Sequence, residues 1–128
     1  MRRILFAVFL VGACATVAAA DSNEEAKSAY GRGDYALAAQ LFRSRAEQGN
    51  ARAQNNLGGM YTQGRGVPQD FIRAHVWYSV AAAALSGDNG KAAMKRRDHV
   101  ASQMKAAQVA KAQEMARRCQ QSQFKECD

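Results

Sequence analysis

The sequence contains a single proline in 128 residues, and it has only one tryptophan and two histidines. Proline interrupts helices and alanine is the best helix former, so scarce proline combined with abundant alanine favours helices. The length suits one domain. These features predict an all-α, single-domain protein.

The sequence also lacks the residue patterns of catalytic and cofactor-binding sites. His75 and His99 have no neighbouring Cys, His or Glu cluster at metal-ligand spacing. Asp98 precedes His99, but no nucleophile motif such as G-x-S-x-G accompanies this pair. The glycines of residues 64–66 lack the lysine and serine that end a phosphate-binding loop. We therefore expect no enzymatic activity, no cofactor and no metal ion.

Residues 1–20 have the pattern of a secretory signal peptide. Residues 1–3 carry positive charge, residues 4–12 are apolar, and the alanines at 18–20 offer an A-x-A cleavage site before Asp21. We expect cleavage after Ala20 and a periplasmic or secreted protein.

Two alternatives to cleavage stay open. An uncleaved membrane anchor would use the uncharged residues 4–20, a run at the short limit for spanning a bilayer. A lipoprotein would use Cys14, because VGAC at residues 11–14 resembles a lipobox without its usual leucine. In the lipoprotein case, the lipid on Cys14 is the only membrane attachment that we expect.

Removal of residues 1–20 would take away Arg2 and Arg3 and lower the net charge from +7 to +5. It would also remove Cys14 and leave Cys119 and Cys127. An even number of cysteines in an exported chain indicates a disulfide. Two free thiols are the alternative.

The segment 51–87 predicts two helices joined by a glycine-rich turn. In its first half the apolar residues follow helical spacing: Ala53, Leu57, Met60 and Tyr61. Gly58 and Gly59 lie inside this helix, where each costs about 1 kcal/mol relative to alanine, so we expect another helix to approach closely there. Gly64 ends the helix, and Asp70 lies at the start of the next one.

The second helix of this segment, residues 70–86, has little polar face. One apolar stripe recurs at spacings of three and four residues: Phe71, Ala74, Tyr78, Ala81 and Leu85. Val76, Trp77 and Val80 are apolar as well. A helix that is apolar nearly all round is buried on several sides. Helices from before and after this segment must therefore lie against it.

The same segment resembles a Sel1-like repeat, a relative of the tetratricopeptide repeat. The similarity lies in LGGMYTQGRGVPQDFIRAHVWYSVAA, with the motifs L-G-x-x-Y, G-x-G-V, Q-D and A-x-x-W-Y-x-x-A-A. The matching residues are Leu57, Gly58, Tyr61, Gly64, Gly66, Val67, Asp70, Ala74, Trp77, Tyr78, Ala81 and Ala82. The resemblance implies a right-handed α-solenoid of antiparallel helix pairs.

The flanking segments extend this organisation over residues 21–128. Asp34 and Asp70 lie 36 residues apart, in the range of helical-hairpin repeats. Residues 87–90 indicate a turn, and the helices expected over 91–104 and 106–119 resemble the closing hairpin of Sel1-like chains. The expected units, with about six helices in all, are a degenerate repeat at 21–50, a Sel1-like repeat at 51–87, a capping hairpin at 88–119 and a tail at 120–128. The spacing of Cys119 and Cys127 also resembles that of disulfide-bearing Sel1-like proteins.

The resemblance implies a partner-binding face, because the first helices of tetratricopeptide-like units line a concave surface. Family geometry points five residues toward it: Arg52, Asn55, Gly59, Thr62 and Gln63. Arg52, Asn55 and Gln63 would offer donors and acceptors to an extended peptide or a chain terminus. An inert polar face is the alternative.

The resemblance implies a function as a non-enzymatic, monomeric adaptor of the bacterial cell envelope that binds a protein or peptide. Two alternatives stay open. One is a hydrolase of cell-wall or β-lactam substrates, an activity reported for a few Sel1-like relatives, and the other is an envelope lipoprotein with a structural role. The basic residues 95–97 are expected to form a solvated helix face, and export excludes nucleic acid as a normal partner.

Overall fold

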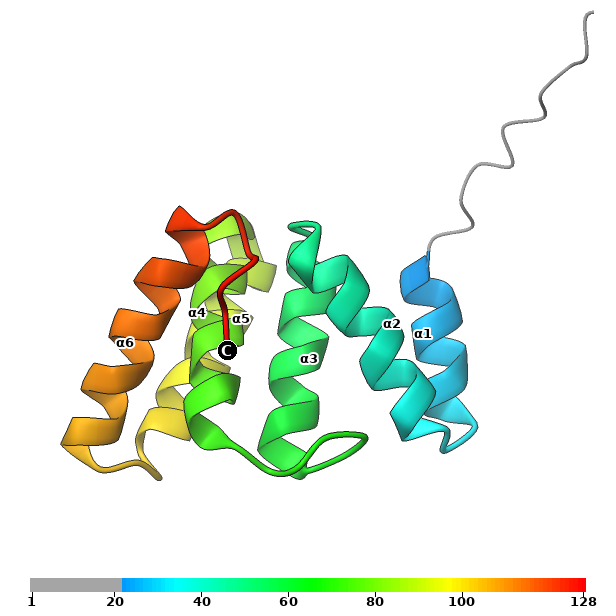
Figure 1. Ribbon diagram of the computed structural model, residues 1–128, viewed down its shortest axis with the longest axis horizontal. Helices are drawn as coiled ribbons and strands as arrows, with labels where there is room; N and C mark the ends of the chain where they lie inside the picture. Colours follow the sequence, from blue (N-terminus) through cyan, green and yellow to red (C-terminus); the bar gives the residue numbers. More distant parts are fainter. Residues whose placement is uncertain (1–21) are drawn as a thin grey trace, which may run out of the picture.

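The computed structural model describes residues 22–128, which form six α-helices and no strand (Figure 1). The helices are α1 (Ser22–Gly31), α2 (Tyr35–Glu47), α3 (Ala51–Gln63), α4 (Phe71–Ala84), α5 (Gly87–Ala101) and α6 (Ala106–Gln121). The prediction of an all-α fold is confirmed. The expected signal peptide and Cys14 lie outside the described residues. None of the helices over 22–128 combines the length and the apolar character that a bilayer span requires.

Helix α4 is the centre of the fold. It packs against α3, α5 and α6, and half of its residues are buried: Ala74, His75, Val76, Trp77, Tyr78, Val80 and Ala81. Trp77 is the largest fully buried side chain. The sequence-based prediction that neighbouring helices enclose this segment is confirmed.

Local sequence signals fix both ends of the α3–α4 turn. Gly64 ends α3 in the left-handed conformation with φ +66°, which glycine adopts without steric cost. Asp70 begins α4, because its carboxylate accepts a hydrogen bond from the amide of Arg73 at 3.0 Å. Between these ends, the amide of Asp70 donates to the carbonyl of Tyr61 at 2.9 Å, which ties the turn back to α3.

The start of α5 differs from the prediction. Residues 87–90 were expected to form a turn, whereas α5 begins at Gly87 and includes all four. Ser86 is the residue before the helix, and Asp88 lies in its first turn, where a carboxylate favours the positive end of the helix dipole. A Cβ on Gly90 would lie 2.6 Å from the carbonyl oxygen of Leu85. Gly90 is therefore needed for close packing at a helix start.

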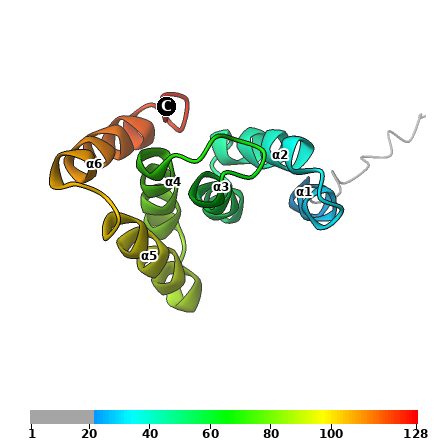
Figure 2. The ribbon, with the colours of Figure 1, turned by 90° about the horizontal axis from the view of Figure 1, so that it is seen from below.

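Helices α5 and α6 occupy the region in which a capping hairpin was expected, residues 88–119. Helices α5 and α6 pack against α4 rather than chiefly against each other, and Figure 2 shows them diverging from it. Each presents one narrow buried stripe: Gly90, Ala93 and Val100 on α5, and Ala112, Met115, Ala116 and Cys119 on α6. Because α4 is apolar on several sides, both stripes can pack against it.

Helix α3 approaches α4 closely at one glycine. A Cβ on Gly58 would lie 2.9 Å from two ring carbons of Tyr78, which is closer than real Cβ atoms come to a neighbour. A Cβ on the adjacent Gly59 would lie 3.4 Å from the Tyr78 hydroxyl oxygen, an ordinary contact. The packing role expected of these glycines therefore belongs to Gly58.

These neighbours make a matched pair for a test of helix packing. We expect Gly58→Ala to lower the free energy of unfolding by about 1–3 kcal/mol, because the ring body of Tyr78 cannot move aside in a packed core. Gly59→Ala should be neutral or stabilising by up to about 1 kcal/mol, since alanine is the better helix former. Urea unfolding followed by circular dichroism measures both. Equal stability of the two variants would contradict the close approach.

Candidate functional site

A groove lies between α1, α3 and α5, which face the same side of the molecule (Figure 2). Two adjoining cavities of about 340 and 300 Å³ form it, and they share Lys27, Asn55, Asn56 and Arg96. We call this surface the concave groove. Phe42, Met60 and Tyr78 contribute apolar surface to its floor. Such a space can hold side chains of an extended segment.

The periodicity of α3 places polar side chains in the concave groove. Asn50 begins α3 by accepting a hydrogen bond from the amide of Ala53 at 3.0 Å. From that start, one face of α3 turns inward with Ala53, Gln54, Leu57 and Tyr61. The opposite face carries Arg52, Asn55, Asn56, Gly59 and Gln63. The burial pattern of α3 thereby fixes the polar lining.

Four of the five residues predicted for the partner-binding face line the groove: Arg52, Asn55, Gly59 and Gln63. Thr62, the fifth, is not among the lining residues of the two cavities. Its hydroxyl donates to the carbonyl of Gly58 at 2.9 Å, a bond that threonine commonly makes inside helices. Thr62 was expected on this face from family geometry alone.

The lining residues outside α3 were not predicted from the sequence. Lys27 and Tyr30 come from α1, and Asn89 and Arg96 come from α5. Arg96 belongs to the basic run 95–97, which was expected to be only a solvated face. Alignment of the two repeats could have identified Lys27, because α1 and α3 occupy equivalent positions in consecutive helix pairs. The position of Arg96 in the groove depends on how α5 packs against α4, and the sequence does not specify this packing.

Polar contacts of Tyr30 link α1 to α3 and to the turn after it. The Tyr30 hydroxyl donates to the side-chain oxygen of Gln63 at 3.1 Å and accepts from Arg65 at 2.6 Å. The Arg65 guanidinium also lies 5.2 Å from the ring centroid of Tyr35. The side chain of Gln63 is therefore hydrogen-bonded to Tyr30 of α1.

Burial and a nearby positive charge act in opposite directions on the pKa of Tyr78, which lies in the floor of the groove. Burial raises the pKa of the Tyr78 hydroxyl, and a hydrogen bond with Thr62 and the charge of Arg96 oppose this rise. The positive charge of Arg96 thus acts on the groove floor. Tyr78 stays protonated at neutral pH and serves as a neutral wall.

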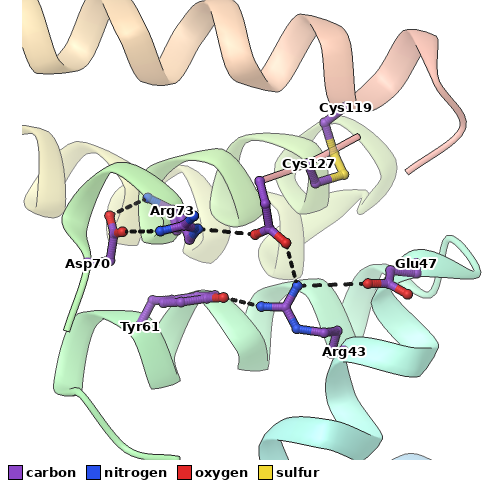
Figure 3. Close-up of polar contacts among 8 residues, drawn as sticks. Arg43, Glu47, Tyr61, Asp70, Arg73, Cys119 and Cys127 are labelled. Carbon is purple, nitrogen blue, oxygen red and sulfur yellow. Dashed lines mark hydrogen bonds and ion pairs between the residues drawn. A yellow bond between two sulfur atoms is a disulfide. The ribbon is translucent and has the colours of Figure 1, made fainter. Parts of the chain in front are cut away.

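A second set of polar contacts surrounds the C-terminal tail (Figure 3), which lies on the far side of the molecule from α1, α3 and α5 (Figure 2). Cys119 and Cys127 form a disulfide, so the tail turns back after α6. Asp128 accepts hydrogen bonds from Arg43 of α2 at 2.8 Å and from Arg73 of α4 at 3.2 Å. We call these contacts the tail clamp.

Neighbouring groups orient the two arginines of the tail clamp. Arg73 also pairs with Asp70 at 2.7 Å, and Asp70 raises the pKa of Arg73. Arg43 donates to the hydroxyl of Tyr61 and lies 3.8 Å from Glu47. Burial raises the pKa of Tyr61, although the charge of Arg43 opposes this shift. Both guanidinium groups are thus already paired with residues of the same chain.

The described residues show no arrangement for metal chemistry. No group of three or more His, Cys, Asp and Glu side chains within residues 22–128 could hold a metal ion. His75 is buried, and burial, followed by the charge of Arg97, lowers its pKa. The Ser79 hydroxyl donates to the backbone carbonyl of His75 at 2.7 Å. His75 is therefore a neutral packing residue.

Comparison with protein-family models gives two matches to the Sel1 repeat, at residues 27–50 and 51–84. The first match covers the second half of α1 and all of α2, and the second covers α3 and α4. These matches support a Sel1-like repeat protein, and with the six helices they imply the tetratricopeptide-like solenoid that the sequence predicts. Neither a curated protein nor a solved structure shows significant similarity to the chain.

The tail clamp combines a covalent and an ionic element that mutations can separate. We expect Cys119→Ser with Cys127→Ser to lower the free energy of unfolding by about 2–3 kcal/mol, because the unfolded chain gains freedom. Asp128→Asn should cost at most about 1 kcal/mol, since its ion pairs are partly exposed and screened. Urea unfolding with and without reductant measures both effects. An unchanged unfolding midpoint for the double serine variant would contradict this account.

Proposed function

We propose that this chain, in which residues 27–84 form two Sel1-like repeats, is a non-enzymatic, monomeric adaptor of a bacterial cell envelope. It binds a segment of another protein in the concave groove. Sel1 repeats are generally protein–protein interaction modules. The observation that carries the proposal is the groove itself, in which α1, α3 and α5 present polar side chains around an apolar floor.

The chemistry of the groove supports binding rather than catalysis. Its lining from residues 22–128 includes lysine, arginine, asparagine, glutamine and tyrosine, but no serine, cysteine, histidine, aspartate or glutamate. A hydrolase of the kind considered above needs a nucleophile and a base within hydrogen-bond reach of each other. The groove offers hydrogen bonds and surface instead.

Peptide selection tests the proposal. A random-sequence peptide library is displayed on phage and selected against the purified chain, and the enriched peptides are synthesised with a fluorescent label. We expect Arg52→Ala with Asn55→Ala to weaken their binding about tenfold or more, because hydrogen bonds to a charged group are lost. The melting temperature should stay unchanged, since Arg52 is exposed, and Asn55 is half-buried and its Oδ1 atom accepts no hydrogen bond from residues 22–128.

The matched control is Lys111→Ala with Gln113→Ala, which removes two exposed polar side chains from α6. Its binding should equal that of the unchanged chain. If both double variants bind equally well, or if the groove variant melts earlier, the groove is not the binding site.

Export is the second part of the proposal. It is supported by the signal-peptide pattern of residues 1–20 and by the Cys119–Cys127 disulfide, because disulfides persist in oxidising compartments. We expect the chain, expressed with residues 1–20 in a bacterial host, to be recovered from the periplasm. Its intact mass should correspond to a start at Asp21. A mass that includes residues 1–20 would contradict cleavage, and a lipid-modified start at Cys14 would establish the lipoprotein alternative.

A further inference from the structure

The concave groove carries positive charge from three different helices. Lys27 of α1, Arg52 of α3 and Arg96 of α5 all line it, and Lys27 and Arg96 border both of its cavities. No acidic residue is among the lining residues from the described part of the chain. The groove is therefore a cationic surface, with Arg52 on α3 and with Lys27 and Arg96 on the two helices beside it.

Two of these charges are available to a partner. Within residues 22–128, Arg52 and Arg96 form no ion pair and no side-chain hydrogen bond. On the far side, in contrast, Arg43 and Arg73 are paired with Asp128 and Asp70. Lys27 pairs with Glu24 at 2.9 Å, but both side chains are more than half exposed, so this contact exchanges readily with water or another anion.

The groove also holds an acceptor that needs a donor. The side-chain oxygen Oδ1 of Asn55 is buried and has no hydrogen-bond partner among the described residues. A buried polar atom without a partner costs free energy, and Asn55 lines both cavities of the groove together with Lys27 and Arg96. The backbone N–H of an extended polypeptide is a donor of the required kind, and a peptide bound this way would place its side chains toward Lys27 and Arg96.

We infer that the concave groove takes an extended protein segment that carries at least two acidic side chains. This inference rests on the proposed function, in which the groove holds a segment of another protein. Carboxylates pair with arginine through charge-assisted hydrogen bonds, and Arg52 and Arg96 supply the donors. The amide of Asn55 fixes the backbone between them, and Met60 and Tyr78 receive apolar side chains.

A protein segment fits the groove better than a nucleic acid does. Binding of single-stranded nucleic acid relies on exposed aromatic rings on which bases stack. Tyr78 is only 4% exposed. The ring of Tyr30 is contacted edge-on by Tyr35 and covered by the guanidinium of Arg65. The aromatic rings of the groove therefore offer no stacking platform.

Fluorescence anisotropy with three labelled peptides tests the inference on the full chain. Glutamate, glutamine or lysine alternates with alanine in these peptides, which otherwise match. We expect the glutamate peptide to bind, and the glutamine peptide to bind at least about tenfold more weakly, because charged hydrogen bonds exceed neutral ones in strength. The lysine peptide should not bind. Affinity for the glutamate peptide should fall as salt is raised.

Charge-matched variants locate the binding. Arg52→Ala with Arg96→Ala should weaken binding of the glutamate peptide about tenfold or more. Lys111→Ala with Lys125→Ala removes the same charge from α6 and the tail, where both side chains are exposed, and should leave affinity unchanged. Equal losses in the two variants would show attraction to net charge alone and would overturn the inference.

Other outcomes separate this inference from the proposed function. If neutral peptides selected from the library need Arg52 and Asn55 while the glutamate peptide does not bind, the proposed function stands and the acidic preference is wrong. If no selected peptide depends on Arg52 and Asn55, both are wrong. Equal affinity for the glutamate peptide and for single-stranded oligothymidylate, each lost in the Arg52/Arg96 variant, would overturn the assignment to an acidic protein segment.

Discussion

The enclosure of α4 is the constraint on which the rest of the structure depends. This helix is apolar on several sides, and three helices cover it, with Trp77 fully buried at the contact. The indole N–H of Trp77 has no hydrogen-bond partner among residues 22–128, so packing rather than polar recognition holds this side chain. Because a single partner cannot shield α4 from water, the chain needs both α3 and the helices beyond residue 86 to enclose it.

The same enclosure determines where the polar surfaces lie. Gly58 lets α3 approach the ring of Tyr78, and this contact fixes which face of α3 is turned away from the core. The outward face then carries Arg52 and Asn55, while α5, held on another side of α4, adds Arg96. The groove is thus assembled from three helices whose positions are each set by burial elsewhere. Its unpaired charges are tolerated because they lie in water rather than in the core.

Local signals in the sequence were sufficient to predict α3 and α4. Apolar periodicity, the left-handed Gly64 and the capping carboxylate of Asp70 act within a few residues, so they can be read without the fold. The prediction of a turn at residues 87–90 was wrong because polar residues such as Asp88 also suit the first turn of a helix. The divergence of α5 from α6, the contribution of Arg96 to the groove and the pairing of Asp128 with two distant arginines all depend on tertiary packing. No local pattern encodes them.

The tail clamp changes how this small array holds together. In an open stack of repeats, each unit touches only its neighbours, and the ends can fray independently. Here Asp128 reaches Arg43, a residue 85 positions earlier in the chain, and the Phe124 ring lies against Gly49 at the end of the first matched repeat. The last residues are thereby attached to the second helix across the whole of the second repeat. These contacts join the tail to α2 and to the turn after it, so the segment that follows the second repeat also touches the first repeat.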